Sequence, residues 1–462
     1  MLFDSFGGAM TDVKLTEPGW FHPSRGAYRY TVLLFVGLLP FGSYFAYDSI
    51  GAMATTLMKA WHTDQSTIGG MYTIYSVAAI ICVLLAGLMI DRIGTRLASL
   101  ILSGLVVGGA CIVALAPNIT IAAAGRFIFG AGSESLIVAQ SAILARWFRG
   151  KELALSFGVT LAIMRLGTLF SFNTVSSVVD TCDRTGCVFW QPGLGFKAAL
   201  WVAAGLCAFS LLCNLVYFAM DKHGERALGL AEAGAGDKIV FADVKKFGPS
   251  YWYVVALCAT FYSAIFPFTA LSTDFFHEKW GLPLSMQSGV GFLAKVFNDF
   301  LHMFSTAGGT TSIIIFASMC LAAFAGGFVD RVGRRASLML LGALLMIPCY
   351  LTLGFTMAPP YLPMILLGAS FVLVPAAMWP SVPLIVEKNV TGTAFGLMTM
   401  IQNAGLALFP YLNGRLRVAT HSYQASMVMF ASLGAVGFVF ALLLLGADRR
   451  EGGALERGAA QG

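Results

Sequence analysis

Two oppositely charged residues lie in neighbouring apolar stretches of this chain. Glu134 is in the first stretch and Arg165 in the second, and a basic group, Arg146, Arg149 and Lys151, separates them. We expect this basic group to lie in water at a membrane surface. Each charge is then roughly 20 Å away along its helix, at about 1.5 Å per residue. A charge at that depth is costly, so such residues usually face a partner or a water-filled cavity and mark a pathway.

Glu134 and Arg165 have the chemistry to hold a small zwitterion. A carboxylate can bind an ammonium group, and a planar guanidinium offers a matching fork to a carboxylate. When the site is empty, we expect the two side chains to neutralise each other. The alternative is a buried ion pair with only a structural role.

The composition indicates an integral membrane protein. Hydrophobic residues make up 58% and charged residues 11% of the 462 positions, against roughly 45–50% and 25% in soluble domains. Apolar runs of about 20 residues, long enough to span a bilayer, recur from end to end. The net charge of +6 therefore does not indicate a nucleic-acid partner. The nine cysteines show no metal-ligand spacing, and we expect neither a metal nor a cofactor.

The apolar runs predict an all-α membrane protein with twelve transmembrane helices in two pseudo-symmetric six-helix bundles. If the termini are cytoplasmic, that side holds 20 of the 29 Lys and Arg residues and the opposite loops hold 7, as the positive-inside rule requires. The predicted parts are a cytoplasmic tail (1–29), an N-terminal bundle (30–220), a cytoplasmic linker (221–248), a C-terminal bundle (249–446) and a cytoplasmic tail (447–462).

The second half carries extra residues near 288–305. Leu293, Phe297, Phe300 and Phe304 fall on one helical stripe with polar residues opposite, which predicts an amphipathic helix in the non-cytoplasmic membrane interface. A lid, a partner contact and a longer loop are alternative uses, of which we favour the longer loop.

The two halves repeat a motif for which we predict a role in conformational gating. Five residues recur 239 positions later, so that Gly87, Asp91, Arg92, Gly94 and Arg96 match Gly326, Asp330, Arg331, Gly333 and Arg335. A second anchor around Phe157 and Gly167 recurs with an offset of 238. Two anchors at nearly the same offset indicate an internal duplication, which is typical of secondary transporters.

Each position of the motif has a physical interpretation. The first glycine permits close helix approach, the aspartate can face a helix N-terminus, and the second glycine permits a tight turn. Such a loop could lock the two bundles together in one state and release them in another. The motif resembles that of the major facilitator superfamily, which the chain is similar to over its whole length.

Other segments narrow this resemblance. FGSYFAYD (41–48), GRFIFGAGSESLIVAQ (125–140), MRLG (164–167) and GLMTMIQNAGLA (396–407) resemble the lysosomal dipeptide uniporters of that superfamily. The resemblance implies passage of dipeptides down their gradient, with Glu134 and Arg165 as the substrate-holding acid and base. It also implies an accessory membrane glycoprotein and a lysosomal or other endomembrane location, with the plasma membrane as an alternative.

Polar and aromatic residues on other spans complete the predicted substrate site, namely Tyr44, Tyr72, Tyr75, Trp379, Gln402 and Asn403. Asn403 is the repeat equivalent of Arg165. Helix packing is the alternative role for the aromatic residues, and bonding between helices is the alternative for the two amides. Arg126 either steers protons or supports the bundle.

Cys182 and Cys187 lie in one polar loop on the predicted non-cytoplasmic side. A disulfide between them would persist in an oxidising compartment.

The predicted function is facilitative uniport of dipeptides across a lipid bilayer by alternating access. The alternative is a proton-coupled transporter of another small polar or zwitterionic solute, with Glu134 as the proton carrier. The first span lacks the E-x-x-E-R pattern expected of proton-coupled peptide transporters. No span shows a nucleophile with its base or an H-E-x-x-H motif, so an enzyme is not expected.

Overall fold

The computed structural model describes residues 22–23, 25–148, 152–185, 194–228, 247–286, 298, 301–387 and 390–457, apart from a few side chains within these ranges. The described residues form helices joined by short connections, with no strand. Cys187, Arg149, Lys151 and most of the predicted insertion near 288–305 lie outside the described residues.

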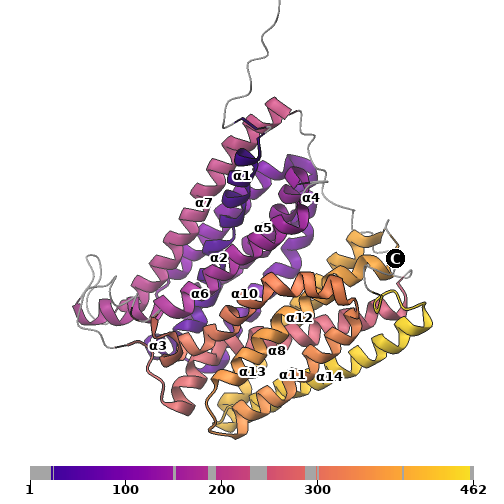
Figure 1. Ribbon diagram of the computed structural model, residues 1–462. Coiled ribbons are helices and arrows are strands. Elements are labelled where there is room, and N and C mark those ends of the chain that lie inside the picture. The colour runs from indigo at the N-terminus through magenta and orange to yellow at the C-terminus, as the bar shows by residue number, and fades with distance from the viewer. Residues whose placement is uncertain are drawn as a thin grey trace, which may run out of the picture.

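The chain forms two sequential helical bundles (Figure 1). The N-terminal bundle contains α1 (Gly26–Leu38), α2 (Phe41–Ala52), α3 (Ala54–Ala60), α4 (Gln65–Leu115), α5 (Ile119–Phe148), α6 (Leu153–Thr185) and α7 (Gly195–Leu228). The C-terminal bundle contains α8 (Pro249–Trp280), the short 3₁₀ helix η2 (Met303–Ser305), α10 (Ala307–Val332), α11 (Arg335–Phe355), α12 (Tyr361–Ile385), α13 (Thr391–Thr420) and α14 (Gln424–Arg450).

Ten helical segments among the described residues are long and apolar enough to cross a membrane. α1 and α2 together form the first, and α4 contains two. α10 begins with a shorter apolar helix, Ala307–Ala322, and α13 is 30 residues long but carries the polar residues Gln402 and Asn403. These two helices complete the predicted twelve. The prediction of an all-α membrane fold in two six-helix bundles is therefore confirmed.

Both copies of the repeated motif turn at a glycine. α4 changes direction at Gly94, where φ is 78° and ψ is 164°. The repeat equivalent, Gly333, ends α10 with φ at 66° and ψ at −122°. Residues with a Cβ rarely adopt such positive φ values, so glycine suits both positions.

Several helices extend past the predicted boundaries. α1 begins at Gly26 rather than at residue 30, and α14 continues to Arg450 rather than ending at 446. α7 continues to Leu228, so the predicted linker start at Asp221 lies inside a helix. Apolar periodicity marks the part of a helix in lipid and misses the polar turns beyond it.

Asp221 is fully buried instead of belonging to a flexible linker. Its carboxylate accepts hydrogen bonds from Arg146 at 2.8 Å and from the Trp147 indole at 2.6 Å, and it lies 2.9 Å from Arg96. Arg146 is therefore buried as well, and the prediction that it lies in water is wrong. Opposite charges on α4, α5 and α7 compensate one another inside the bundle, which makes their burial tolerable.

The two bundles diverge from a shared contact and form an open V (Figure 1). α4 and α13 pack against each other where the bundles meet. A Cβ added to Gly69 on α4 would lie 2.1 Å from the Pro410 carbonyl oxygen on α13, and one on Gly414 would lie 2.2 Å from the Gln65 carbonyl oxygen. The helix backbones therefore touch at this end. The ribbons separate toward the end where α1 begins and α14 ends (Figure 1).

Candidate functional site

The predicted substrate residues come from both bundles. They are Tyr44 on α2, Tyr72 and Tyr75 on α4, Glu134 on α5, Arg165 on α6, Trp379 on α12, and Gln402 and Asn403 on α13. The structure separates them into a charged group in the N-terminal bundle, an aromatic group in the C-terminal bundle, and residues engaged in packing.

Tyr75 orients Glu134. The Tyr75 hydroxyl donates a hydrogen bond of 2.8 Å to Glu134 Oε1 and also lies 3.1 Å from Ser133 Oγ. Its ring packs edge-on against Tyr47, with the centroids 4.7 Å apart. Among the described residues, Tyr75 is the one hydrogen-bond partner of the Glu134 carboxylate. The second carboxylate oxygen is therefore available to a cationic ligand.

Arg165 points toward the opposite bundle. Its guanidinium carbon lies 4.0 Å from the ring centroid of Phe371 on α12. Within the described part of the chain, the guanidinium makes no hydrogen bond and no ion pair. The expected mutual neutralisation of Glu134 and Arg165 is therefore wrong for this conformation. Glu134 turns to α4 while Arg165 turns to α12, and Tyr44 lies within electrostatic range of both.

Asp48 is a central acid that the sequence analysis did not select. It lies on α2 and is 4% exposed. It is within electrostatic range of both Arg165 and Arg126. The central charges on the N-terminal bundle thus include two acids and two arginines. A signal was present, because an ionisable residue within an apolar span indicates a functional position by default.

Aromatic rings of the C-terminal bundle face Arg165. The Trp379 indole donates a hydrogen bond of 3.1 Å to the Tyr262 hydroxyl, and its ring stacks on Phe395 with centroids 5.9 Å apart. Tyr262 also lies within electrostatic range of Arg165. Sequence analysis found Trp379 but missed Tyr262 and Phe371, because aromatic residues in an apolar helix give no indication of the direction they face.

Arg126 is enclosed by aromatic rings. Its guanidinium carbon lies 5.2–5.3 Å from the ring centroids of Tyr47, Tyr72, Tyr75 and Phe129. The side chain is 2% exposed, and its Nε and Nη2 have no hydrogen-bond partner. Desolvated cation–π contacts offset part of the cost of this burial. Since Tyr75 also bonds to Glu134, the arginine supports the orientation of that carboxylate.

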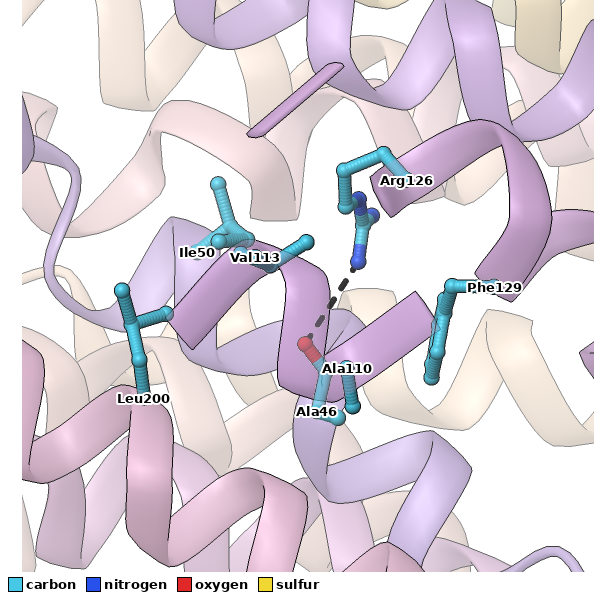
Figure 2. Close-up of a pocket in the computed structure, with 7 residues that line it drawn as sticks. All are labelled: Ala46, Ile50, Ala110, Val113, Arg126, Phe129 and Leu200. Atoms are coloured by element: carbon cyan, nitrogen blue, oxygen red, sulfur yellow. Dashed lines mark hydrogen bonds between the residues drawn. The ribbon is translucent and has the colours of Figure 1, made fainter. Parts of the chain in front are cut away.

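A small pocket adjoins Arg126 (Figure 2). In Figure 2, the Arg126 Nη1 points at the Ala46 carbonyl oxygen, 3.5 Å away. The rest of the lining is apolar and comprises Ile50, Ala110, Val113, Phe129 and Leu200. The pocket offers no polar group to a peptide besides the arginine and this carbonyl, so it is a packing space beside the site.

Three predicted residues are engaged in helix packing. The Tyr72 hydroxyl donates to the Tyr47 carbonyl oxygen at 3.3 Å, and Gln402 accepts from the Cys258 thiol at 3.5 Å. Asn403 is 2% exposed and donates to the Thr399 carbonyl oxygen of its own helix at 3.1 Å. These contacts agree with the alternative interpretation of bonding within and between helices. A substrate role for the three residues stays a prediction.

The repeated motif makes contacts within its own bundles. Arg96 forms ion pairs with Asp221 and Glu225 of α7, and Arg92 is exposed. The Arg335 amide donates to the Leu455 carbonyl oxygen at 2.8 Å. The side chains of Asp91, Asp330 and Arg331 and the surroundings of Gly326 lie outside the described residues, while Gly87 is half-buried on α4. A role of this motif in gating stays a prediction.

The closed end of the V contains a carboxylate that joins the two bundles. Asp274 on α8 accepts hydrogen bonds from Thr55 at 2.9 Å and Gln65 at 3.2 Å, both in the N-terminal bundle. It also accepts one of 2.6 Å from Tyr423 in its own bundle. Sequence analysis missed Asp274, because an acid near the end of an apolar span resembles an ordinary interfacial residue.

Cys182 at the end of α6 is disulfide-bonded. Its predicted partner, Cys187, lies outside the described residues, and the pairing stays a prediction.

Comparison with known proteins gives consistent matches over nearly the whole chain. A sequence model of the Major Facilitator Superfamily matches residues 36–305 and 292–460. The lysosomal dipeptide transporter MFSD1 of Danio rerio is 33% identical over 443 residues, covering 95% of this chain and 91% of that protein. The transporter of the same name from Homo sapiens is 31% identical over 448 residues, covering 96% and 91%.

The fold also matches a solved structure. A mutant of the nucleoside transporter NupG superposes with a TM-score of 0.68, covering 89% of this chain and 99% of that chain. The two sequences are 14% identical, so this likeness shows the fold alone.

Proposed function

The chain belongs to the major facilitator superfamily of membrane transporters, and we propose that it carries dipeptides across a membrane by facilitated uniport. The named relatives are lysosomal dipeptide transporters at 31–33% identity over at least 95% of this chain. Their names support both the dipeptide substrate and a lysosomal location. The proposal also places the two termini and the connection between α7 and α8 in the cytoplasm. The accessory membrane glycoprotein is a further part of the proposal, to be tested by co-purification.

The observation that carries the proposal is the separation of Glu134 and Arg165. The two groups make no ion pair with each other in the described structure, and Tyr44 lies within range of both. A dipeptide presents an ammonium at one end and a carboxylate at the other. Glu134 would hold the ammonium and Arg165 the carboxylate, through charge-assisted hydrogen bonds.

The charge balance of the site favours a zwitterion. Asp48 and Arg126 add one further charge of each sign, so the four central groups sum to zero when all are ionised. A zwitterion leaves that sum unchanged, whereas a net anion or cation would add an uncompensated charge between the bundles. The bundles meet at one end and diverge at the other (Figure 1), which is the arrangement expected for rocking around a central site.

A proton-coupled transporter is the second candidate. Two carboxylates, Asp48 and Glu134, lie among the central helices, and intramembrane acids are common proton carriers. Uniport and symport differ in whether a proton gradient can drive accumulation.

Purified protein in liposomes tests both candidates. Dipeptides, single amino acids, sugars and organic anions are offered with and without an imposed pH gradient. We expect dipeptides to equilibrate to the same level in both conditions, while the other solutes do not enter. Accumulation beyond equilibrium only with an inward proton gradient would exclude uniport and favour coupling.

Glu134→Gln tests the ammonium end. The variant should weaken binding of a free dipeptide far more than binding of its N-acetylated form, because the acetylated peptide has no ammonium to lose. If the affinities for the free and the N-acetylated dipeptide fall equally, Glu134 does not bind the substrate ammonium.

A further inference from the structure

The Arg165 guanidinium lies over an aromatic ring contributed by the other bundle. Arg165 is on α6, and Phe371, 4.0 Å from the guanidinium carbon, is on α12. This separation is well within the roughly 6 Å that defines a cation–π contact. Arg165 is half-buried, whereas Phe371 is 2% exposed.

Neighbouring rings fix the position of Phe371. Phe266 packs edge-on against it with centroids 5.6 Å apart, and Tyr262 does so at 6.4 Å. Phe261 stacks on it at 6.5 Å with an interplanar angle of 27°. All three rings are on α8. The face that Phe371 presents to the arginine is therefore set by packing within the C-terminal bundle.

A stacked guanidinium keeps its hydrogen-bond donors. The five N–H groups of arginine lie in the plane of the guanidinium, so a ring against its face leaves them free for a carboxylate. Among the described groups, none takes a hydrogen bond from Arg165. The arginine is thus held by its face while its edge stays unoccupied.

We propose that Phe371 is a positioning residue for the carboxylate end of the substrate. It holds the Arg165 guanidinium in one plane, which presents the donor fork before the peptide arrives. Preorganisation of this kind improves affinity because less side-chain freedom is lost on binding. The inference rests on the proposed function, since it requires a substrate carboxylate at Arg165.

The contact also makes the carboxylate subsite depend on both bundles. Arg165 belongs to the N-terminal bundle, and its fork is fixed only while Phe371 of α12 lies against the guanidinium on α6. A rearrangement that separates these helices releases the guanidinium from the ring. Peptides with a free carboxylate therefore favour the conformation in which Phe371 contacts Arg165.

The test compares a dipeptide with its C-terminally amidated form. The dissociation constants of both are measured on the full-length protein in detergent or nanodiscs, and their ratio is calculated. Phe371→Leu should lower the preference for the free carboxylate by about 2- to 30-fold, the range that a cation–π contact supplies. Phe371→Trp should preserve the preference, because an indole face binds cations at least as well.

Two controls separate positioning from general damage. Trifluorinated phenylalanine at position 371 keeps the shape of the ring but removes the negative potential of its face, so it should act in the same direction as leucine. Phe430→Leu removes a fully buried ring that contacts Phe268 and Tyr350 and, among the described residues, no cation. It should lower the melting temperature without changing the preference.

The outcomes are distinguishable. If the wild-type protein shows no preference for the free carboxylate, Arg165 is not a carboxylate site and the proposed function fails. If the wild type has the preference and both the leucine and the fluorinated variants retain it in full, the inference about Phe371 is overturned while the proposed function stands.

Discussion

The two halves of this molecule share a fold but contribute different chemistry to the space between them. Glu134, Arg165 and Asp48 all lie on the N-terminal bundle, whereas the facing residues that the structure describes on the C-terminal bundle include Tyr262 and Phe371. The two halves therefore have similar sets of helices, but the side chains that they present to the site differ in charge. Under the proposed function, the charged half binds the peptide ends that all dipeptides share, and the aromatic half faces the variable remainder.

The sharpest test uses one pair of repeat-equivalent positions. Arg165→Gln removes the only partner proposed for the substrate carboxylate and should cost about 4 kcal/mol of binding, or roughly a thousandfold in affinity. Asn403→Ala should change affinity by less than about threefold, because its amide bonds to its own helix. The dissociation constant of one dipeptide is measured for both variants. Similar losses of affinity would contradict the proposed role of Arg165.

Melting temperatures complete this test. Arg165 forms no ion pair in the described structure, so Arg165→Gln should melt close to the wild type. A large loss of stability in that variant would instead indicate a structural bridge.

The second test compares the buried acids near the ends of α7 and α14. Asp221 is fully buried and bonds to two arginines, so Asp221→Asn should lower the free energy of unfolding by about 3 kcal/mol. Asp448 is 2% exposed but accepts from the Leu455 backbone amide, so Asp448→Asn should cost about 1 kcal/mol. Thermal unfolding in detergent measures the stability of both variants. Equal losses would show that pairing with two arginines does not make Asp221 more important for stability than Asp448.

The third test removes the C-terminal segment. Leu455 is fully buried, and the Glu456 carboxylate accepts hydrogen bonds from the Ser337 amide at 2.9 Å and its hydroxyl at 2.8 Å. Deletion of residues after Arg450 should therefore cost about 2 kcal/mol of stability, chiefly from the lost burial of Leu455. Leu455→Ala alone should reproduce most of the loss. Unchanged melting would show that the segment contributes nothing to the C-terminal half.

The smallest expected effect concerns the carboxylate that joins the halves. Asp274→Asn weakens hydrogen bonds to Thr55 and Gln65 and should shift the population toward separation at this end by about 1 kcal/mol. Spin labels at the exposed positions Lys59 and Arg415 would report a longer distance.

The matched control for Asp274 is one helical turn away. Glu278 on α8 pairs with Arg417 at 2.8 Å within the same bundle, so Glu278→Gln should leave that distance unchanged. If both variants lengthen the distance, the cause is the loss of a negative charge at this end, and not the loss of the Asp274 hydrogen bonds to Thr55 and Gln65.

Sequence reasoning predicted the fold well because membrane spans and repeated motifs leave strong local signals. Glu134 and Arg165 were identifiable as charges in apolar runs, and the same rule applied to Asp48 would have selected it. Phe371 could not be selected this way, since its role depends on which helix lies opposite. Its function is a property of the assembled bundles.

Asp221 was misinterpreted for a different reason. A charge at the edge of a span usually lies in water, and its burial here depends on Arg96 and Arg146, which come from other helices. The position of Asn403 in the repeat does not give the direction of its side chain, and its amide bonds to its own helix. A role for it at the substrate site stays a prediction.

The bond between Glu456 and Ser337 spans 119 positions of sequence, so during synthesis it can form only after most of the C-terminal bundle has been made. In the N-terminal half, the ion pairs of Arg96 with Asp221 and Glu225 use no residue beyond Glu225. This half can therefore fold while the ribosome is still extending the chain. The start of α11, by contrast, depends on Glu456, which comes 119 residues after Ser337. The C-terminal half therefore reaches its final form only after α12, α13 and α14 have been synthesised and Glu456 can bond to the start of α11.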